Sequence, residues 1–220
     1  MVTTSSLEFI LLHTTKYGEN ALVLHTLSRE YGRKGLFVKG AGTRKSSMSL
    51  FQPLNILEAD VNDVSKGGLL PARNVSARYP LNGIRSNLYK NAIVMFMSEV
   101  LYRSVKEGCN EDGLYEWVEK NILLLDAVET DFSNFHLRFL LEYAVRLGFS
   151  PESRELEPFV RDHYPFVVEF MQTGFAESML MPLNGKARNE IAEGLLRYIE
   201  YHIESALHIN SLKVLHDILA

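Results

Sequence analysis

The chain has 220 residues, of which 46% are hydrophobic and 23% are charged, and this composition is that of an ordinary globular protein. It contains no apolar run near the roughly 18 residues of a transmembrane helix, and its N-terminus lacks the basic region and long apolar run of a signal peptide. We therefore expect a cytoplasmic protein. The single cysteine, Cys109, excludes an internal disulfide and any zinc site built from several cysteines.

The charge is divided unevenly along the chain. Residues 1–80 carry 10 Lys and Arg against 6 Asp and Glu, whereas residues 81–220 carry 13 against 21. A part with net charge +4 therefore precedes a part with net charge −8. Six of the basic residues lie between positions 29 and 45, beside a single acid, Glu30. A basic module joined to an acidic body suggests that the two parts have different tasks.

The first part of the chain predicts five short strands. The strand-like runs are separated by turn signals and by a loop rich in Gly and Ser at 40–49, and they cover residues 7–13, 21–27, 35–39, 51–61 and 69–81. Five such strands favour a small closed barrel, because an open sheet of this size would leave two edges and one face uncovered. We prefer an OB-type barrel, although an SH3-like barrel fits the periodicity almost as well.

The second part of the chain has the spacing of helices. Apolar periodicity and helix-ending residues predict helices at 86–106, 112–126, 133–147, 187–207 and 211–219. The segment 148–182 is less regular, since it holds four prolines and a strand-like run, Phe166–Met171. The fold class expected is α+β, with a five-stranded OB-type barrel over residues 1–82 followed by an all-helical domain over residues 83–220.

The basic run between positions 29 and 45 is the strongest candidate for a contact with nucleic acid. Single-stranded nucleic acid needs cations for its phosphates and flat side chains on which its bases can stack. An ordinary solvated surface is the alternative interpretation of such a run. The candidates for phosphate contacts are, in order of preference, Lys39, Arg44, Lys45, Arg33, Lys34 and Arg29.

Aromatic residues lie among or near these cations, at Tyr17, Tyr31, Phe37 and Phe51. Tyr31 is the candidate for base stacking because it lies inside the basic run. Phe37 lies between two apolar residues of a strand-like run, so a place in the barrel core is about as well supported for it as a place at the surface.

Patterns that would indicate catalysis or a cofactor are weak. The segment Gly40–Lys45 has the wrong spacing for a phosphate-binding loop. The seven histidines show no pair at metal-ligand spacing with a carboxylate partner, and no pair of carboxylates is singled out for acid–base chemistry. We therefore expect no enzyme activity, no cofactor and no metal, and a hydrolase is a remote alternative.

The order of these elements resembles that of RecO, the family of bacterial recombination mediator and DNA-repair proteins. The resemblance is carried by residues 11–41, 43–47 and 50–61 in the barrel part and by residues 134–151 and 195–219 in the helical part. It implies an OB-fold domain followed by a helical domain, binding of single- and double-stranded DNA, annealing of complementary strands, and association with the bacterial nucleoid.

The resemblance also implies partners. These are RecR and the single-stranded-DNA-binding protein SSB, with which the family loads the RecA recombinase onto DNA. A pocket for the acidic and apolar tail of SSB would need a basic residue beside an apolar helix surface, for which Arg103 and Arg138 are candidates. The alternative function is a protein-interaction adaptor, in which the basic barrel binds an acidic protein.

Many members of the family carry a four-cysteine zinc motif after the segment that matches residues 148–151. This chain has no cysteine there. A metal-free version of that subdomain is expected.

Overall fold

The computed structural model describes residues 4–40, 49–62, 68–149 and 153–219, and the structural statements below concern these residues. They divide into two compact units, the first formed by residues 1–82 and 98–123 and the second by residues 83–97 and 124–220. Helices α3 (Leu88–Ser104) and α4 (Leu114–Ala127) each contribute residues to both units.

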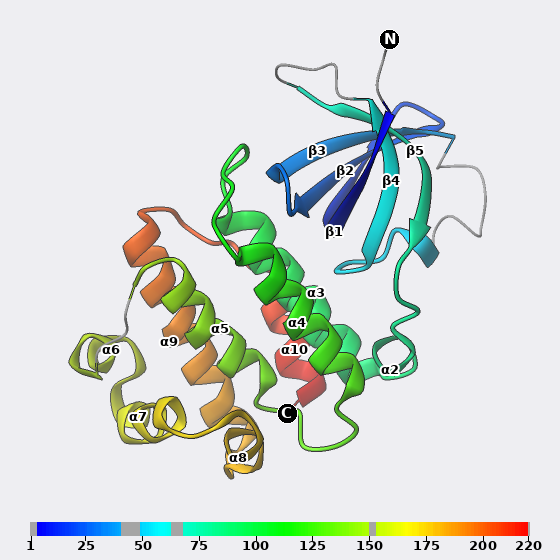
Figure 1. The fold of residues 1–220 in the computed structure, drawn as a ribbon. Helices are drawn as coiled ribbons and strands as arrows, with labels where there is room; N and C mark the ends of the chain where they lie inside the picture. Colours follow the sequence, from blue (N-terminus) through cyan, green and yellow to red (C-terminus); the bar gives the residue numbers. More distant parts are fainter. Residues whose placement is uncertain (1–3, 41–48, 63–67, 150–152, 220) are drawn as a thin grey trace. The chain divides into compact units, whose positions relative to one another are not determined.

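The first unit contains a barrel of five strands (Figure 1). The strands are β1 (Thr4–Tyr17), β2 (Ala21–Ser28), β3 (Gly32–Lys39), β4 (Ile56–Asn62) and β5 (Leu70–Ala77). Their order is β1-β2-β3-β5-β4, and the barrel is closed because β1 pairs with both β2 and β4. β3 and β5 are parallel, and the other pairs are antiparallel. This closed five-stranded barrel confirms the OB-type fold preferred above.

The barrel core comes from the alternation of apolar side chains along each strand. Every second residue of a strand faces the interior. The buried residues of the barrel core include Leu7, Phe9 and Leu11 of β1, Leu24 of β2, Leu36 and Val38 of β3, and Leu57, Ala59 and Val61 of β4. The register of β1 against β2 shifts between Leu11 and His13. Such an irregularity reverses which residues face outward, so beyond it the odd-numbered residues of β1 lie on the outer face.

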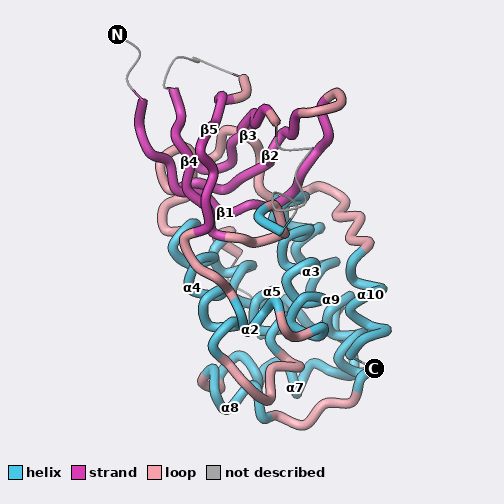
Figure 2. Tube along the Cα trace, turned by 90° about the vertical axis from the view of Figure 1, so that its right-hand side faces the viewer, coloured by secondary structure: helices cyan, strands magenta, loops and turns pink. Residues whose placement is uncertain are grey.

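The remaining helices belong to the second unit, and Figure 2 shows them in cyan. They are α2 (Asn82–Arg85), α5 (Phe135–Arg146), α6 (Ser153–Val160), α7 (Tyr164–Gln172), α8 (Phe175–Leu180), α9 (Gly185–Ile203) and α10 (Ser211–Leu219), with a 3-10 turn at Arg161–His163. α9 packs against α5 and α6. No helix in the described ranges has both the length and the apolar character needed to cross a membrane.

The strand-like run at Phe166–Met171 does not form a strand, because these residues lie in α7. Pro165 lies in the first turn of this helix, where its missing N–H costs no hydrogen bond. The buried residues of α7, Val167 and Phe170, are three positions apart, which is the spacing of a helix face. Burial on one helix face therefore outweighs the β propensity of this run.

The predicted strand at 51–61 begins later than expected, at Ile56. The residues before it turn, since Leu54 has a positive φ of 55°. The side chain of Asn55 donates hydrogen bonds to the carbonyls of Ser49 and Leu50, at 3.3 and 2.7 Å. A side chain that satisfies neighbouring carbonyls in this way holds the turn and delays the strand.

Candidate nucleic-acid interface

Tyr17, Phe37 and Lys39 form a row of side chains, here called the outer row, on the outer face of the barrel. In the ladder, Tyr17 of β1 lies opposite Ala21 of β2, and Ala21 lies opposite Lys39 of β3. Residues directly opposite each other in antiparallel strands point to the same face. Since Val38 belongs to the barrel core, its neighbours Phe37 and Lys39 point outward.

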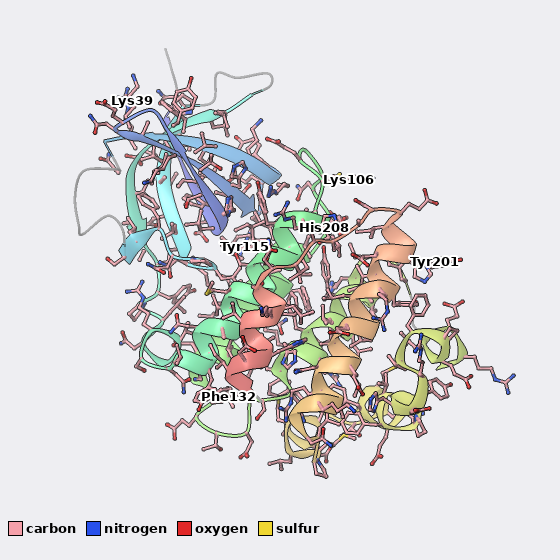
Figure 3. All side chains as sticks on the ribbon, turned by 180° about the vertical axis from the view of Figure 1, so that it is seen from behind. Lys39, Lys106, Tyr115, Phe132, Tyr201 and His208 are labelled. Carbon is pink, nitrogen blue, oxygen red and sulfur yellow. The ribbon has the colours of Figure 1, made fainter. Side chains whose placement is uncertain are left out.

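The row presents an aromatic pair beside a cation. The ring of Tyr17 is 61% exposed and meets the ring of Phe37 edge to face, with 5.4 Å between centroids and 88° between planes. Lys39 is exposed at the end of β3 (Figure 3). The next residue, Gly40, donates its backbone N–H to the carbonyl of Asn20 at 2.6 Å, which fixes the end of β3 against the β1–β2 turn. A flat exposed ring and an ammonium group held together can contact a base and a phosphate.

The predicted phosphate contacts lie in different environments. Lys39 is exposed and belongs to the outer row, whereas Arg44 and Lys45 lie outside the described residues. Lys34 is half-buried and lies opposite Thr26. Thr26 is on the same face of β2 as the core residue Leu24, so Lys34 is on the face of β3 opposite to Lys39.

Arg33, predicted to contact phosphate, is buried. Its side chain is on β3, and the residue is only 7% exposed. The guanidinium lies over the ring of Tyr102 of α3, 4.6 Å from its centroid. Burial lowers the pKa of Arg33. A surface contact between this guanidinium and DNA would require the side chain to leave the ring, so Arg33 is not part of the exposed interface.

Two further predicted residues are also engaged within the first unit. Arg29 is exposed, but its Nε lies 3.2 Å from a carboxylate oxygen of Glu116 and its Nη2 lies 3.4 Å from one of Glu119. Tyr31 is half-buried and packs against the barrel core, which covers part of its side chain. The described residues of the basic run therefore do not converge on one exposed face, and Lys39 is the one among them that lies in the outer row.

The two predicted partner-binding arginines differ in exposure. Arg138 donates from Nη1 to the carbonyls of Phe170 and Thr173, at 3.3 and 2.9 Å, and from Nε to Glu142 at 2.7 Å. Its Nε and Nη1 donors are thus used inside the second unit. The side chain of Arg103 is 45% exposed and lies 4.0 Å from Glu99, so it remains accessible to a partner.

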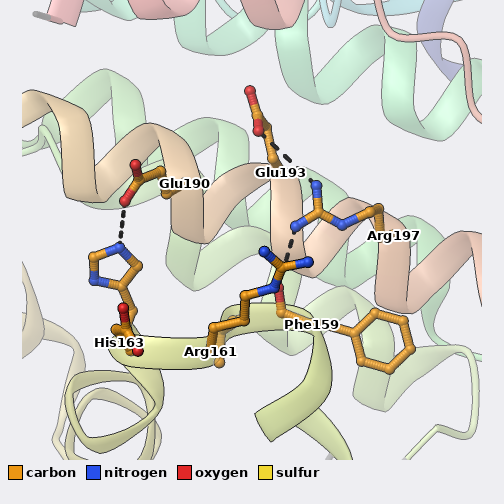
Figure 4. Close-up of a pocket in the computed structure, with 8 residues that line it drawn as sticks. Phe159, Arg161, His163, Glu190, Glu193 and Arg197 are labelled. Atoms are coloured by element: carbon orange, nitrogen blue, oxygen red, sulfur yellow. Dashed lines mark hydrogen bonds and ion pairs between the residues drawn. The ribbon is translucent and has the colours of Figure 1, made fainter.

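The second unit has a cavity of about 460 Å³ beside α9 (Figure 4). His163 Nε2 lies 2.6 Å from Glu190 Oε2, and Arg197 lies 3.9 Å from Glu193 and donates to the carbonyl of Phe159. The described residues that line the cavity include no serine, threonine or cysteine that could act as a nucleophile. Across the described ranges, no three His, Cys, Asp or Glu side chains come together as metal ligands.

The sequence named Tyr17 only as one of the aromatic residues near the basic run and singled out Tyr31 for base stacking, although Tyr17 is the most exposed aromatic residue of the row. The signal was indirect. Tyr17 precedes a turn, and the pairing across that turn places it beside the strand that carries Phe37 and Lys39. Only the ladder with its register shift reveals this neighbourhood.

The fold and this surface define a class: a two-unit protein with an OB-type barrel whose outer face carries an aromatic pair and a cation. Residues 1–76 match the family model described as Recombination protein O N terminal, and residues 85–155 match the one described as Recombination protein O C terminal. The chain belongs to the RecO family of DNA repair proteins.

Curated relatives agree with this family. The chain is 32% identical to the DNA repair protein RecO of Phocaeicola vulgatus over 66% of this chain and 61% of the relative. It is 34% identical to that of Flavobacterium johnsoniae over 67% and 63%. These two alignments span less than two thirds of each relative's length. The chain is 28% identical to the DNA repair protein RecO of Flavobacterium psychrophilum, over 96% of this chain and 97% of the relative.

Proposed function

We propose that this protein is a non-enzymatic mediator of recombinational DNA repair. It binds single- and double-stranded DNA, anneals complementary strands, and helps to load the RecA recombinase onto DNA coated by SSB, together with RecR. Membership of a DNA repair family supports the biological setting. The observation that carries the molecular part of the proposal is the exposed Tyr17–Phe37 pair beside Lys39 on the outer face of an OB-type barrel.

The chemistry of this surface suits a single strand of DNA. A base can stack on the exposed ring of Tyr17, for which base–aromatic stacking contributes about 1–3 kcal/mol per base. Lys39, together with Arg44 and Lys45, which follow it in the sequence, neutralises phosphates. When cations cover the phosphates of two strands, the repulsion between the strands falls, and annealing of complementary sequences becomes easier.

The partner contacts belong to the same proposal. Arg103 is the better of the two arginines for the tail of SSB, since its side chain is 45% exposed while that of Arg138 is 20% exposed and uses Nε and Nη1 within the second unit. The contact surface for RecR is assigned to no residue.

The charge-reversal variant Lys39→Glu with Arg44→Glu tests the DNA-binding site. We expect its affinity for a fluorescent oligo-dT, measured by anisotropy at low salt, to fall at least about tenfold, because two attractive charges become repulsive. Annealing of complementary oligonucleotides should slow in parallel. Lys213→Glu, an exposed position of α10, is the matched control and should keep wild-type affinity.

Wild-type affinity in the double variant, with unchanged thermal unfolding, would overturn the site assignment. The same assay distinguishes the proposed DNA-binding function from the alternative of a protein-interaction adaptor. An adaptor whose barrel binds an acidic protein would not bind oligo-dT, and oligo-dT would not displace its protein partner.

A further inference from the structure

The outer face of β1 and β2 carries a second cluster, next along the strands from the aromatic pair. His13 of β1 lies opposite His25 of β2, with 5.8 Å between ring centroids. Both rings contact Tyr102 of α3, at 4.6 and 5.2 Å between centroids. The hydroxyl of Thr15, which lies between His13 and Tyr17 on the same face, is 3.1 Å from Nε2 of His25.

The charged groups around this histidine pair come from β3, α3 and the segment after α3. Arg33 and Arg103 both lie over the ring of Tyr102, at 4.6 and 5.7 Å from its centroid. Nη1 of Arg33 is buried and has no hydrogen-bond partner among the described residues. The acids are Glu99, which lies 4.0 Å from Arg103, and Glu107, which attracts both Arg33 and His25. With both histidines neutral, two cations face two acids.

Protonation of the pair would make the cluster strongly positive. Burial is the main cause that lowers the pKa of His13 and of His25. Arg103 and Arg33 lower the pKa of His13 further, and Arg33 and His13 lower that of His25. The acids Glu99 and Glu107 act in the opposite sense, more weakly. His13 is exposed and His25 is half-buried, so an anion can approach the pair from solvent.

The histidine pair and the Tyr17–Phe37 pair follow one another along the outer face of the barrel. His13 and Tyr17 are four residues apart on the same face of β1, a distance of about 13 Å at the rise of a strand. Successive phosphates of one DNA strand are about 3.4 Å or more apart, so at most about four nucleotides span the distance from His13 to Tyr17.

We propose that His13 and His25 form a proton-dependent phosphate site, which extends the Tyr17–Phe37–Lys39 surface along β1 and β2 and strengthens the binding of single-stranded DNA at acidic pH. This inference rests on the proposed DNA-binding function. In the protonated state each imidazolium adds a positive charge and a donor for a backbone phosphate. The phosphate in turn offsets the repulsion from Arg33 and Arg103 that disfavours protonation.

The direction of the pH effect follows from linkage. In the free protein the pKa of each histidine lies below its usual value, and a bound phosphate raises it. The complex therefore binds more protons than the free protein between these two pKa values. Affinity then rises as pH falls through this window, by up to about tenfold per pH unit for each histidine, and levels off below it.

The test measures the affinity of the full-length protein for fluorescent oligo-dT between pH 8 and pH 5.5 at constant ionic strength. We expect wild-type affinity to increase by about tenfold or more over this range. The variant His13→Gln with His25→Gln should bind as the wild type does at pH 8 and lose most of the increase. His208→Gln, an exposed histidine of the second unit, is the control and should keep it.

The variant His13→Lys adds a permanent cation. It should bind tightly at pH 8 with a reduced dependence on pH, an effect that a purely structural role of His13 would not produce. Calorimetry in two buffers of different ionisation enthalpy should detect proton uptake by the wild type at pH 6.5 and none by the double variant.

Wild-type affinity that does not change with pH, or pH dependence that survives in the double variant, would overturn the histidine site while leaving DNA binding intact. If the wild type bound no oligo-dT at any pH, the proposed function itself would fail and the inference with it.

Discussion

Arginine and lysine residues that are neighbours in one basic run have different environments in this protein. Lys39 is exposed, whereas Arg33 is buried over an aromatic ring and Arg29 faces two carboxylates. An arginine suits both of the latter positions, because its planar guanidinium stacks on rings and pairs with carboxylates. A basic residue can therefore serve a DNA contact or an internal contact, and its surroundings in the fold decide which of the two it makes.

Gly32 shows how one residue joins the barrel to the segment after α3. Its φ is +58°, and a Cβ added there would overlap the carbonyl oxygen of Cys109. The neighbouring Arg33 donates its N–H to this same oxygen at 3.0 Å and accepts a hydrogen bond from the N–H of Gly108 at 2.9 Å. A side chain at position 32 would force these backbones apart.

We predict that Gly32→Ala destabilises the first unit by about 2–4 kcal/mol, since backbone strain and an overlap with main-chain atoms add together. Urea unfolding followed by the fluorescence of Trp117, the single tryptophan, reports on this unit. Gly18→Ala is the control, because Gly18 has a similar φ of +62° but open space around it. It should cost only about 1–2 kcal/mol, and equal losses in the two variants would contradict the role of the Cys109 contact.

At the scale of elements, the helix α7 depends on a side chain from another helix. Arg138 of α5 donates to the carbonyls of Phe170 and Thr173, at the C-terminal end of α7, where carbonyls have no partner within the helix. A basic group also suits the negative end of a helix dipole. This contact helps to explain why a run with strand propensity is helical here.

We predict that Arg138→Met loosens the end of α7. Two carbonyls lose a charged donor, which corresponds to about 1–3 kcal/mol. Hydrogen exchange measured by mass spectrometry should become faster at the amides of residues 164–173. Arg146→Met, at an exposed position in the last turn of the same α5, should leave this exchange unchanged. Unchanged protection in the Arg138 variant would return this residue to the candidates for a direct partner contact.

At the scale of the whole molecule, the net charge of −4 opposes the binding of DNA, so attraction must come from the local excess of cations in the barrel part. If roughly four phosphates of a single strand are contacted, the logarithm of the affinity should fall against the logarithm of the salt concentration with a slope of about −3. Anisotropy titrations from 50 to 200 mM salt, at a fixed pH of about 8, would measure this slope.

The Lys39→Glu and Arg44→Glu variant should reduce the size of this slope by about 1.4, because each of the two lost phosphate contacts on a single strand contributes about 0.7. The Lys213→Glu control should not change it. A slope near zero in the wild type would show that binding does not depend on phosphates.

The helix and strand positions were largely predictable where local patterns are strong. Strand-like apolar runs separated by turn signals located the strands β1 to β5, and helical spacing located α3, α4, α5, α9 and α10. The strand-like appearance of Phe166–Met171 was misleading for a physical reason. A short apolar run of β-branched and aromatic residues fits the period of a strand and that of a helix, and packing selected the helix.

Local sequence determined the barrel class, the helical second part and the concentration of positive charge, because strand alternation, helix ends and composition are properties of neighbouring residues. Tertiary structure decided which of those charges reach solvent. The register shift in β1 turns Tyr17 and His13 outward, and the contact with Tyr102 buries Arg33. His13 lies opposite His25, 12 positions away, and Arg33 contacts Tyr102, 69 positions away. Pairing across strands and cover by a helix are interactions between distant residues, so the period of a single strand does not contain them.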